Sequence, residues 1–168
     1  FIGQHRAGYG SRVLAELRGV IDEGGGSPFW DAIAGRFFGM NFQEADEFNA
    51  MHGTQFIPDL IPKTPIYTAM LPECARCVMG VPHPTGRAAM KMLEREGFHY
   101  DGYIDIFDGG PTMSALTDQV RTVRESKELS FSEISDDMDS EPLMLAAGRL
   151  HDFVACYGHV GLGDDGSA

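Results

Sequence analysis

The stretch that decides the fold begins Val81-Pro82-His83-Pro84 and ends Tyr103-Ile104-Asp105-Ile106-Phe107-Asp108-Gly109-Gly110-Pro111. Between these two motifs, the residues from Thr85 to Glu96 predict a short helix that carries its apolar side chains on one face. Gly97 follows the helix, at a position where glycine commonly adopts the left-handed C-cap conformation. The order therefore predicts a helix, a Gly97-Phe98 corner and then a strand.

His83 occupies an unusual position, because one proline precedes it and another follows it just before the predicted helix. Proline restricts the backbone, and the first N–H groups of a helix have no partner within it. An imidazole titrates near neutral pH, so a histidine here is a candidate for proton exchange with a substrate. The alternative is a loop or helix-N-terminal histidine without a part in catalysis.

Four motifs carry a resemblance to a known family. They are, in chain order, Arg18-Gly19-Val20-Ile21-Asp22-Glu23, Ser27-Pro28-Phe29-Trp30, Pro65-Ile66-Tyr67 and the stretch from Tyr103 to Pro111. Taken together they are similar to the bacterial arginine N-succinyltransferases. The resemblance runs from Phe1 to about Arg124 and returns weakly over Leu143–Val160. The helix that ends at Gly97-Phe98 also resembles the ending of the acyl-CoA N-acyltransferase (GNAT) fold, and a weaker copy of that unit lies upstream.

The resemblance implies an α/β protein with the GNAT-like acyl-CoA N-acyltransferase fold, of which this chain is expected to be the C-terminal portion. Residues 1–115 are expected to belong to the GNAT-like domain. Residues 116–168 are expected to form a helix, an acidic loop and the beginning of a small β-rich appendage. The loop that binds the pyrophosphate of coenzyme A is expected upstream of Phe1, because residues 1–12 match the helix that follows that loop. The absence of an initiator Met is expected of a fragment, a processed product or an incomplete record.

The resemblance also implies an activity: transfer of a succinyl group from succinyl-CoA to the α-amine of L-arginine, the first step of succinyl-dependent arginine degradation. Succinyl-CoA is expected as a cosubstrate, with no permanently bound cofactor. The expected assembly is a homo-oligomer or a pair with a related subunit. Two alternatives stay open: a non-catalytic subunit or fragment that completes an oligomeric acyltransferase, and an acyltransferase for another amine such as ornithine.

His83 gains a role from the resemblance, because the matching histidine of the family is assigned as a proton donor. Many GNAT enzymes use a tyrosine to protonate the coenzyme A thiolate. The corresponding stretch here offers Trp30 instead, and an indole does not supply a proton near neutral pH. We therefore expect His83 to be catalytic and Trp30 to be a packing residue.

Four charged residues are candidates for substrate binding. Asp105 and Asp108 are expected at a strand end, pointing to different faces, where a carboxylate can hold an ammonium or guanidinium group. The alternative for Asp108 is that it only starts the Gly-Gly-Pro turn. Glu16 and Arg18 alternate with small and apolar residues and so share one face of a predicted strand. They would bind each other, or Arg18 would meet the substrate's carboxylate.

Composition limits the partners. The chain has 25 acidic and 13 basic residues, a net charge of −12, which argues against nucleic acid and suits a cationic small substrate. Solubility alone is the alternative explanation. No apolar run approaches the roughly 20 residues that span a bilayer, so no membrane partner is expected. Three cysteines without a signal-peptide pattern predict reduced thiols in the cytoplasm.

The remaining segments predict further elements. Residues 1–12 are expected to end a helix, residues 12–22 to form a buried strand, and Ser27 to cap a helix that runs from Pro28 to about Phe38. Residues 117–128 are expected to be helical, and residues 143–160 to be strand-like. Cys74 and Cys77 form a lone Cys-x-x-Cys, whereas a structural zinc ion needs four ligands. We therefore expect no metal and interpret both cysteines as ordinary helix residues.

Overall fold

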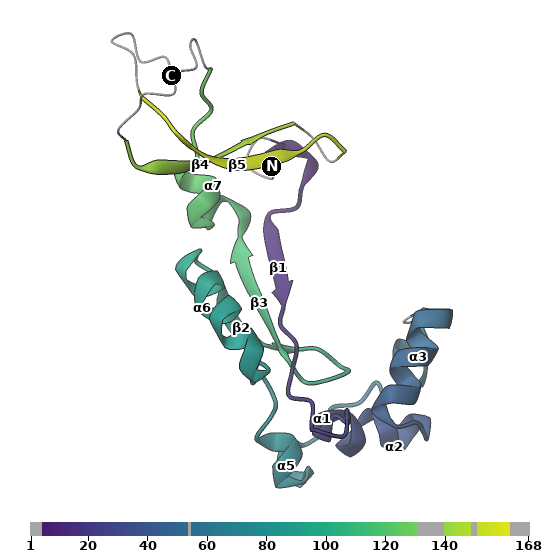
Figure 1. The fold of residues 1–168 in the computed structure, drawn as a ribbon. Helices are drawn as coiled ribbons and strands as arrows, with labels where there is room; N and C mark the ends of the chain where they lie inside the picture. Colours follow the sequence, from purple (N-terminus) through teal and green to yellow (C-terminus); the bar gives the residue numbers. More distant parts are fainter. Residues whose placement is uncertain (1–4, 54, 131–139, 149–150, 162–168) are drawn as a thin grey trace. The chain divides into compact units, whose positions relative to one another are not determined.

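The structure, a computed structural model, describes residues 5–53, 55–130, 140–148 and 151–161 (Figure 1). The chain divides into two compact units. One unit comprises Arg12–Val120, and the other combines Phe1–Ser11 with Arg121–Ala168. Each unit has a sheet of its own: three strands in the first and two in the second. The expected domain division at residue 115 stays a prediction.

The unit Arg12–Val120 contains an antiparallel sheet in the order β1-β3-β2 (Figure 1). Its strands are β1 (Arg12–Glu16), β2 (His99–Ile104) and β3 (Pro111–Leu116). The central strand β3 is buried from Pro111 to Ala115. β1 lies at an edge, and its residues alternate between exposed and half-buried positions. The expected buried strand over residues 12–22 is therefore wrong in length and in burial, because an edge strand has no strand on its second side.

A polar bridge crosses all three strands. Arg12 of β1 donates to the hydroxyl of Ser114 at 2.8 Å, and that hydroxyl donates to the carboxylate of Asp101 at 2.7 Å. Arg12 and Asp101 also form an ion pair of 3.8 Å. Because a slip by one residue would move Ser114 to the other face of the sheet, this bridge helps to fix the register.

Helices α1 (Pro28–Ala32) and α2 (Ala34–Phe38) follow the sheet's first strand. The predicted cap is confirmed, since the Ser27 hydroxyl accepts from the Trp30 N–H at 3.2 Å and Pro28 is the first helical residue. The single helix expected to Phe38 is instead divided at Ile33, whose φ of −118° and ψ of −86° are not helical. Ile33 is buried in a cluster with Phe29 and Ala75, so the residue at which the helix is divided also packs in the core.

Trp30 is the centre of an aromatic cluster and is 0% exposed. Its ring stacks on Phe107 at a centroid distance of 5.1 Å and lies 5.3 Å from Phe38. Its indole N–H donates to the carbonyl of Met40 at 2.9 Å. A buried indole needs such a partner for its N–H, and the packing role expected for Trp30 is confirmed.

The segment that follows is helical but repeatedly interrupted. Helix α3 (Phe42–His52) starts with a capping box, in which Asn41 and Glu44 each accept from the other's backbone N–H at 2.9 Å. Three short elements follow: α4 (Phe56–Leu60), the 3₁₀ turn η2 (Thr68–Met70) and α5 (Glu73–Arg76). The turn η2 directly follows the motif Pro65-Ile66-Tyr67. Prolines in the segment explain the short lengths.

The predicted order of helix, Gly-Phe corner and strand is confirmed. The 3₁₀ turn η3 (Pro84–Gly86) leads into α6 (Arg87–Arg95), and Gly97 follows with a left-handed φ of +94°. Phe98 is buried beside the start of β2. β2 ends at Ile104, directly before Asp105.

The second unit contains the 3₁₀ turn η1 (Arg6–Gly8), helix α7 (Arg121–Glu125) and the antiparallel pair β4 (Pro142–Ala147) and β5 (Val154–His159). Of the helix expected over residues 1–12, residues 1–4 lie outside the described part and only η1 is helical. Residues 117–128 form two short pieces, η4 (Thr117–Gln119) and α7, in place of one helix. Most of the expected acidic loop also lies outside the described residues.

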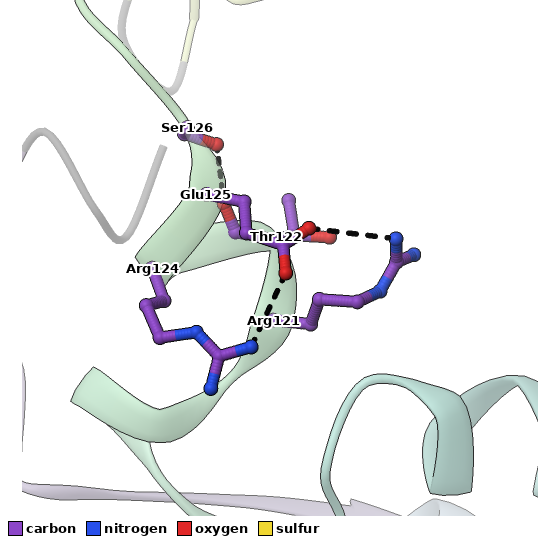
Figure 2. A network of polar contacts seen from close by, with 5 residues as sticks. All are labelled: Arg121, Thr122, Arg124, Glu125 and Ser126. Carbon is purple, nitrogen blue, oxygen red and sulfur yellow. Dashed lines mark hydrogen bonds and ion pairs between the residues drawn. The ribbon is translucent and has the colours of Figure 1, made fainter.

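A surface network organises α7. The Glu125 carboxylate forms ion pairs with Arg121 at 3.8 Å and with Arg124 at 3.2 Å (Figure 2). The Ser126 hydroxyl donates a hydrogen bond to the Thr122 carbonyl. Exposed ion pairs of this kind contribute about 0–1 kcal/mol each. The network therefore supports a helix too short to be stable by itself.

Candidate functional site

Two hydrogen bonds join segments that are far apart in the sequence. The His83 backbone N–H donates to the Arg18 carbonyl at 2.7 Å. The Gly19 backbone N–H donates to Oδ2 of Asp108 at 2.8 Å. These contacts bring His83, Arg18 and Asp108 to one place, with Asp105 in the same turn as Asp108. We call this place the junction, and it consists of residues 18–19, 80–83 and 105–110.

Glycines allow the junction's backbones to approach closely. A Cβ on Gly19 would lie 2.7 Å from the backbone nitrogen of Gly110 and would overlap the Asp108 carbonyl oxygen. A Cβ on Gly110 would in turn overlap the Leu17 carbonyl oxygen. Any side chain at either position would therefore force the two segments apart.

His83 is held by its backbone and by its ring. It caps η3, and Nδ1 of its ring accepts from the Thr85 backbone N–H at 3.3 Å. The Thr85 hydroxyl lies 2.7 Å from the same nitrogen. The ring is half-buried, and within the described part of the chain no residue binds Nε2. Nε2 is thus the ring atom available to a ligand.

Asp108 has both carboxylate oxygens engaged. Oδ2 accepts from the Gly19 N–H, and Oδ1 accepts from the Gly110 N–H at 2.8 Å. These bonds tie the turn to the segment that follows β1. They give Asp108 the turn role that the sequence had left as an alternative, while its contact with a substrate stays a prediction.

Asp105 lies in the same turn. Its Oδ1 accepts from the Phe107 N–H at 2.6 Å, and its backbone N–H donates to the Gly110 carbonyl at 2.8 Å. β2 ends at Ile104, so Asp105 directly follows the strand end expected for both residues, whereas Asp108 lies beyond it in the turn. Asx-type hydrogen bonding favours a turn over a strand at these positions.

Arg18 and Glu16 are both exposed. Glu16 is the last residue of β1 and lies opposite Thr112, whereas Arg18 follows the strand. Their side chains form no ion pair with each other in the described residues, so that alternative is not realised there. Substrate contact by either side chain stays a prediction.

Thr85 is the residue of the site that sequence reasoning missed. His83 stands two positions before Thr85 at the start of a helix, so a bond from the Thr85 N–H to the His83 ring was a capping signal available in the sequence. The close approach of Gly19 to Asp108 had no such signal, since it joins residues 89 positions apart.

The described residues contain no cluster of three or more His, Cys, Asp or Glu side chains suited to a metal ion. Cys74 lies in α5 and Cys77 directly after it, and both are free and exposed. Among the helices described, none is long and apolar enough to cross a membrane.

Comparison with known proteins gives the family. Residues 1–122 match the family model described as arginine N-succinyltransferase beta subunit. The arginine N-succinyltransferase subunit beta of Pseudomonas aeruginosa is 43% identical over 152 residues, which cover 90% of this chain and 45% of that protein. The arginine N-succinyltransferase of Citrobacter koseri is 44% identical over 156 residues, which cover 92% of this chain and 45% of the relative. The chain thus spans about half the length of the curated relatives it matches.

A solved structure agrees with this assignment. The arginine/ornithine succinyltransferase subunit AI from Pseudomonas aeruginosa superposes with a TM-score of 0.77 at 33% identity, covering 99% of this chain and 47% of that one. The expected α/β fold of the GNAT-like type is thereby confirmed, as is the resemblance on which it rested. From the family match over most of its length, we conclude that the chain belongs to the arginine N-succinyltransferase beta-subunit family.

Proposed function

We propose that this protein transfers a succinyl group from succinyl-CoA to the α-amine of L-arginine, with His83 as a catalytic residue. The names of the relatives support the reaction. The observation that carries the residue assignment is the immobilised ring of His83, whose Nε2 is left available at the junction.

The reaction is a direct acyl transfer. The neutral amine nitrogen attacks the thioester carbonyl carbon, a C–N bond forms, the C–S bond breaks, and its electron pair leaves on the coenzyme A sulfur. The attacking nitrogen loses one proton and the thiolate can accept one, so protons balance. Negative charge develops first on the carbonyl oxygen and then on sulfur, and a donor near both atoms lowers the barrier.

His83→Ala tests the residue assignment in the native protein. Because a positioned acid, base or oxyanion donor contributes about 10²–10⁴-fold to the rate, we expect kcat to fall within that range. Initial rates would be measured by coenzyme A release with a thiol reagent, after a far-ultraviolet circular dichroism check of folding. His99→Ala, at an exposed histidine of β2, is the matched control. A His83→Ala protein with more than about a third of wild-type kcat would remove His83 from the mechanism.

Ornithine is a second candidate amine, because the superposed structure is described as an arginine/ornithine succinyltransferase. The two amines share the α-amino acid group and differ in the cation at the far end, guanidinium against ammonium. A planar guanidinium pairs with a carboxylate in a bidentate manner and an ammonium does not. Comparing kcat/KM for the two amines in one preparation decides between them.

The assembly and the location are part of this proposal. A relative named as subunit beta supports a complex of related subunits, in which this chain is either a catalytic member or a non-catalytic one. The His83→Ala test separates these two cases. Three free, exposed cysteines favour a reducing compartment, and we place the protein in the cytoplasm.

A further inference from the structure

We propose that Thr85 fixes the tautomer of the neutral His83 ring, with its proton on Nε2, so that this ring acts as a hydrogen-bond donor to the reacting thioester and not as a base. The catalytic half of this inference rests on the proposed function. The half that concerns the ring's proton does not, and it is tested separately.

The first step of the argument is the geometry at Nδ1. Two groups of Thr85 converge on this one nitrogen: the backbone N–H at 3.3 Å and the side-chain hydroxyl at 2.7 Å. A backbone N–H can only donate, whereas a hydroxyl can donate or accept. A backbone donor directed at Nδ1 requires a lone pair on that nitrogen. In the neutral ring the single proton must then be on Nε2.

The second step concerns what keeps the ring in place. Pro82 and Pro84 restrict the backbone on both sides, and the His83 N–H is bound to the Arg18 carbonyl at 2.7 Å. The ring cannot turn Nδ1 outward without breaking both contacts with Thr85. Nε2 therefore stays without a partner among the described residues and is held as a fixed donor.

The third step is chemical. A neutral ring with its proton on Nε2 has no lone pair there and cannot accept the amine's proton at that atom. It can donate a hydrogen bond to the thioester carbonyl oxygen as negative charge develops, or to the departing sulfur. Such a donor stabilises the transition state without gaining or losing a proton. The amine's proton then leaves to water.

Nuclear magnetic resonance tests the position of the proton. In the ¹⁵N-labelled chain, long-range ¹H–¹⁵N correlation spectra recorded at alkaline pH should show that His83 Nε2 carries a proton and that its Nδ1 does not. The His83→Gln protein identifies the signal by its absence. In Thr85→Val, Nδ1 loses the Thr85 hydroxyl, so the ¹⁵N chemical shift of Nδ1 should change. In Thr85→Ser, which keeps a hydroxyl, this chemical shift should return to the wild-type value. A protonated-type Nδ1 in the wild type, or no change in Thr85→Val, overturns the inference.

Kinetics test the role. Gln places an N–H donor near the position of Nε2 but does not titrate, so His83→Gln should keep at least about tenfold more kcat than His83→Ala. Thr85→Val should lower kcat by about threefold to tenfold, the value of one ordinary hydrogen bond, and Thr85→Ser should recover it. Thr64→Val, at an exposed threonine, is the matched control.

The outcomes separate the two proposals. If His83→Gln is as inactive as His83→Ala, His83 transfers a proton and the donor role is overturned, while the proposed reaction stands. If the wild-type protein transfers no succinyl group to arginine or ornithine, the proposed function fails, and the resonance measurement alone decides where the ring carries its proton.

Discussion

At the scale of single residues, Asp108 shows how one carboxylate can join two backbone segments. It accepts two backbone N–H groups from segments that are far apart in the sequence, Gly19 and Gly110. Hydrogen bonds to a charged acceptor are worth about 1.5–3 kcal/mol each. Asp108 thereby fixes the spacing between the segment after β1 and the turn after β2, and His83 is bound to the first of these segments.

Asp108→Asn should lower the free energy of unfolding by about 1.5–3 kcal/mol, because the amide's NH₂ cannot accept and leaves one backbone N–H unpaired. Urea denaturation with linear extrapolation measures the change. Asp46→Asn, at an exposed position of α3, is the control. Equal stability of the two variants would contradict the structural role. A raised arginine KM at unchanged stability would instead support the predicted contact with substrate.

At the scale of elements, the helices are short and depend on their ends. α1 has five residues, so one cap satisfies a large share of its unpaired N–H groups. That cap, Ser27, is itself 0% exposed, and its hydroxyl has little access to water as an alternative partner. α1 also carries Trp30 and Phe29 into the core, so the cap positions the two largest fully buried side chains.

Ser27→Ala should destabilise the protein by about 0.5–2 kcal/mol, the usual cost of removing a helix N-cap. The upper part of this range is expected, because the Trp30 N–H would be left buried without its acceptor. Thermal and urea unfolding followed by Trp30 fluorescence measure the change. Ser130→Ala, at an exposed serine outside any helix, is the matched control. Coincident unfolding curves for the two variants would refute the importance of the cap.

At the scale of the whole molecule, the two sheets differ in burial. The central strand β3 is buried over five successive residues, and Met113 is 1% exposed. In the pair β4–β5, by contrast, all but one residue in each strand is exposed, including the apolar Met144 and Tyr157. A two-stranded sheet without a buried face is only marginally stable in water.

Hydrogen exchange should reflect this difference. Amides of β4 and β5 should exchange through local opening at least about a hundredfold faster than those of β3, which exchange only when the core opens. Exchange measured by mass spectrometry on peptides from residues 111–116 and 142–159 gives the comparison. Equal protection of the two regions in the free chain would mean that β4–β5 has a buried face.

The sequence by itself determined the local elements and the family. Ser27-Pro28 predicted a helix start, Gly97 a helix end, and Trp30 a core position, and all three are confirmed. These features depend on neighbours within a few residues, where backbone sterics and capping act. The long motifs also identified the family that the comparisons confirm.

The tertiary structure decided where elements stop and which residues meet. Ile33 divides a helix that its sequence would continue, and β1 ends at Glu16 although apolar residues follow, because long-range packing and an edge position outweigh local preference. Likewise, the sequence predicted His83, Arg18 and Asp108 as three separate candidate site residues. Only the fold shows that the Arg18 carbonyl holds His83, that Gly19 holds Asp108, and that Thr85 engages Nδ1, because those contacts depend on the chain's path and not on its pattern.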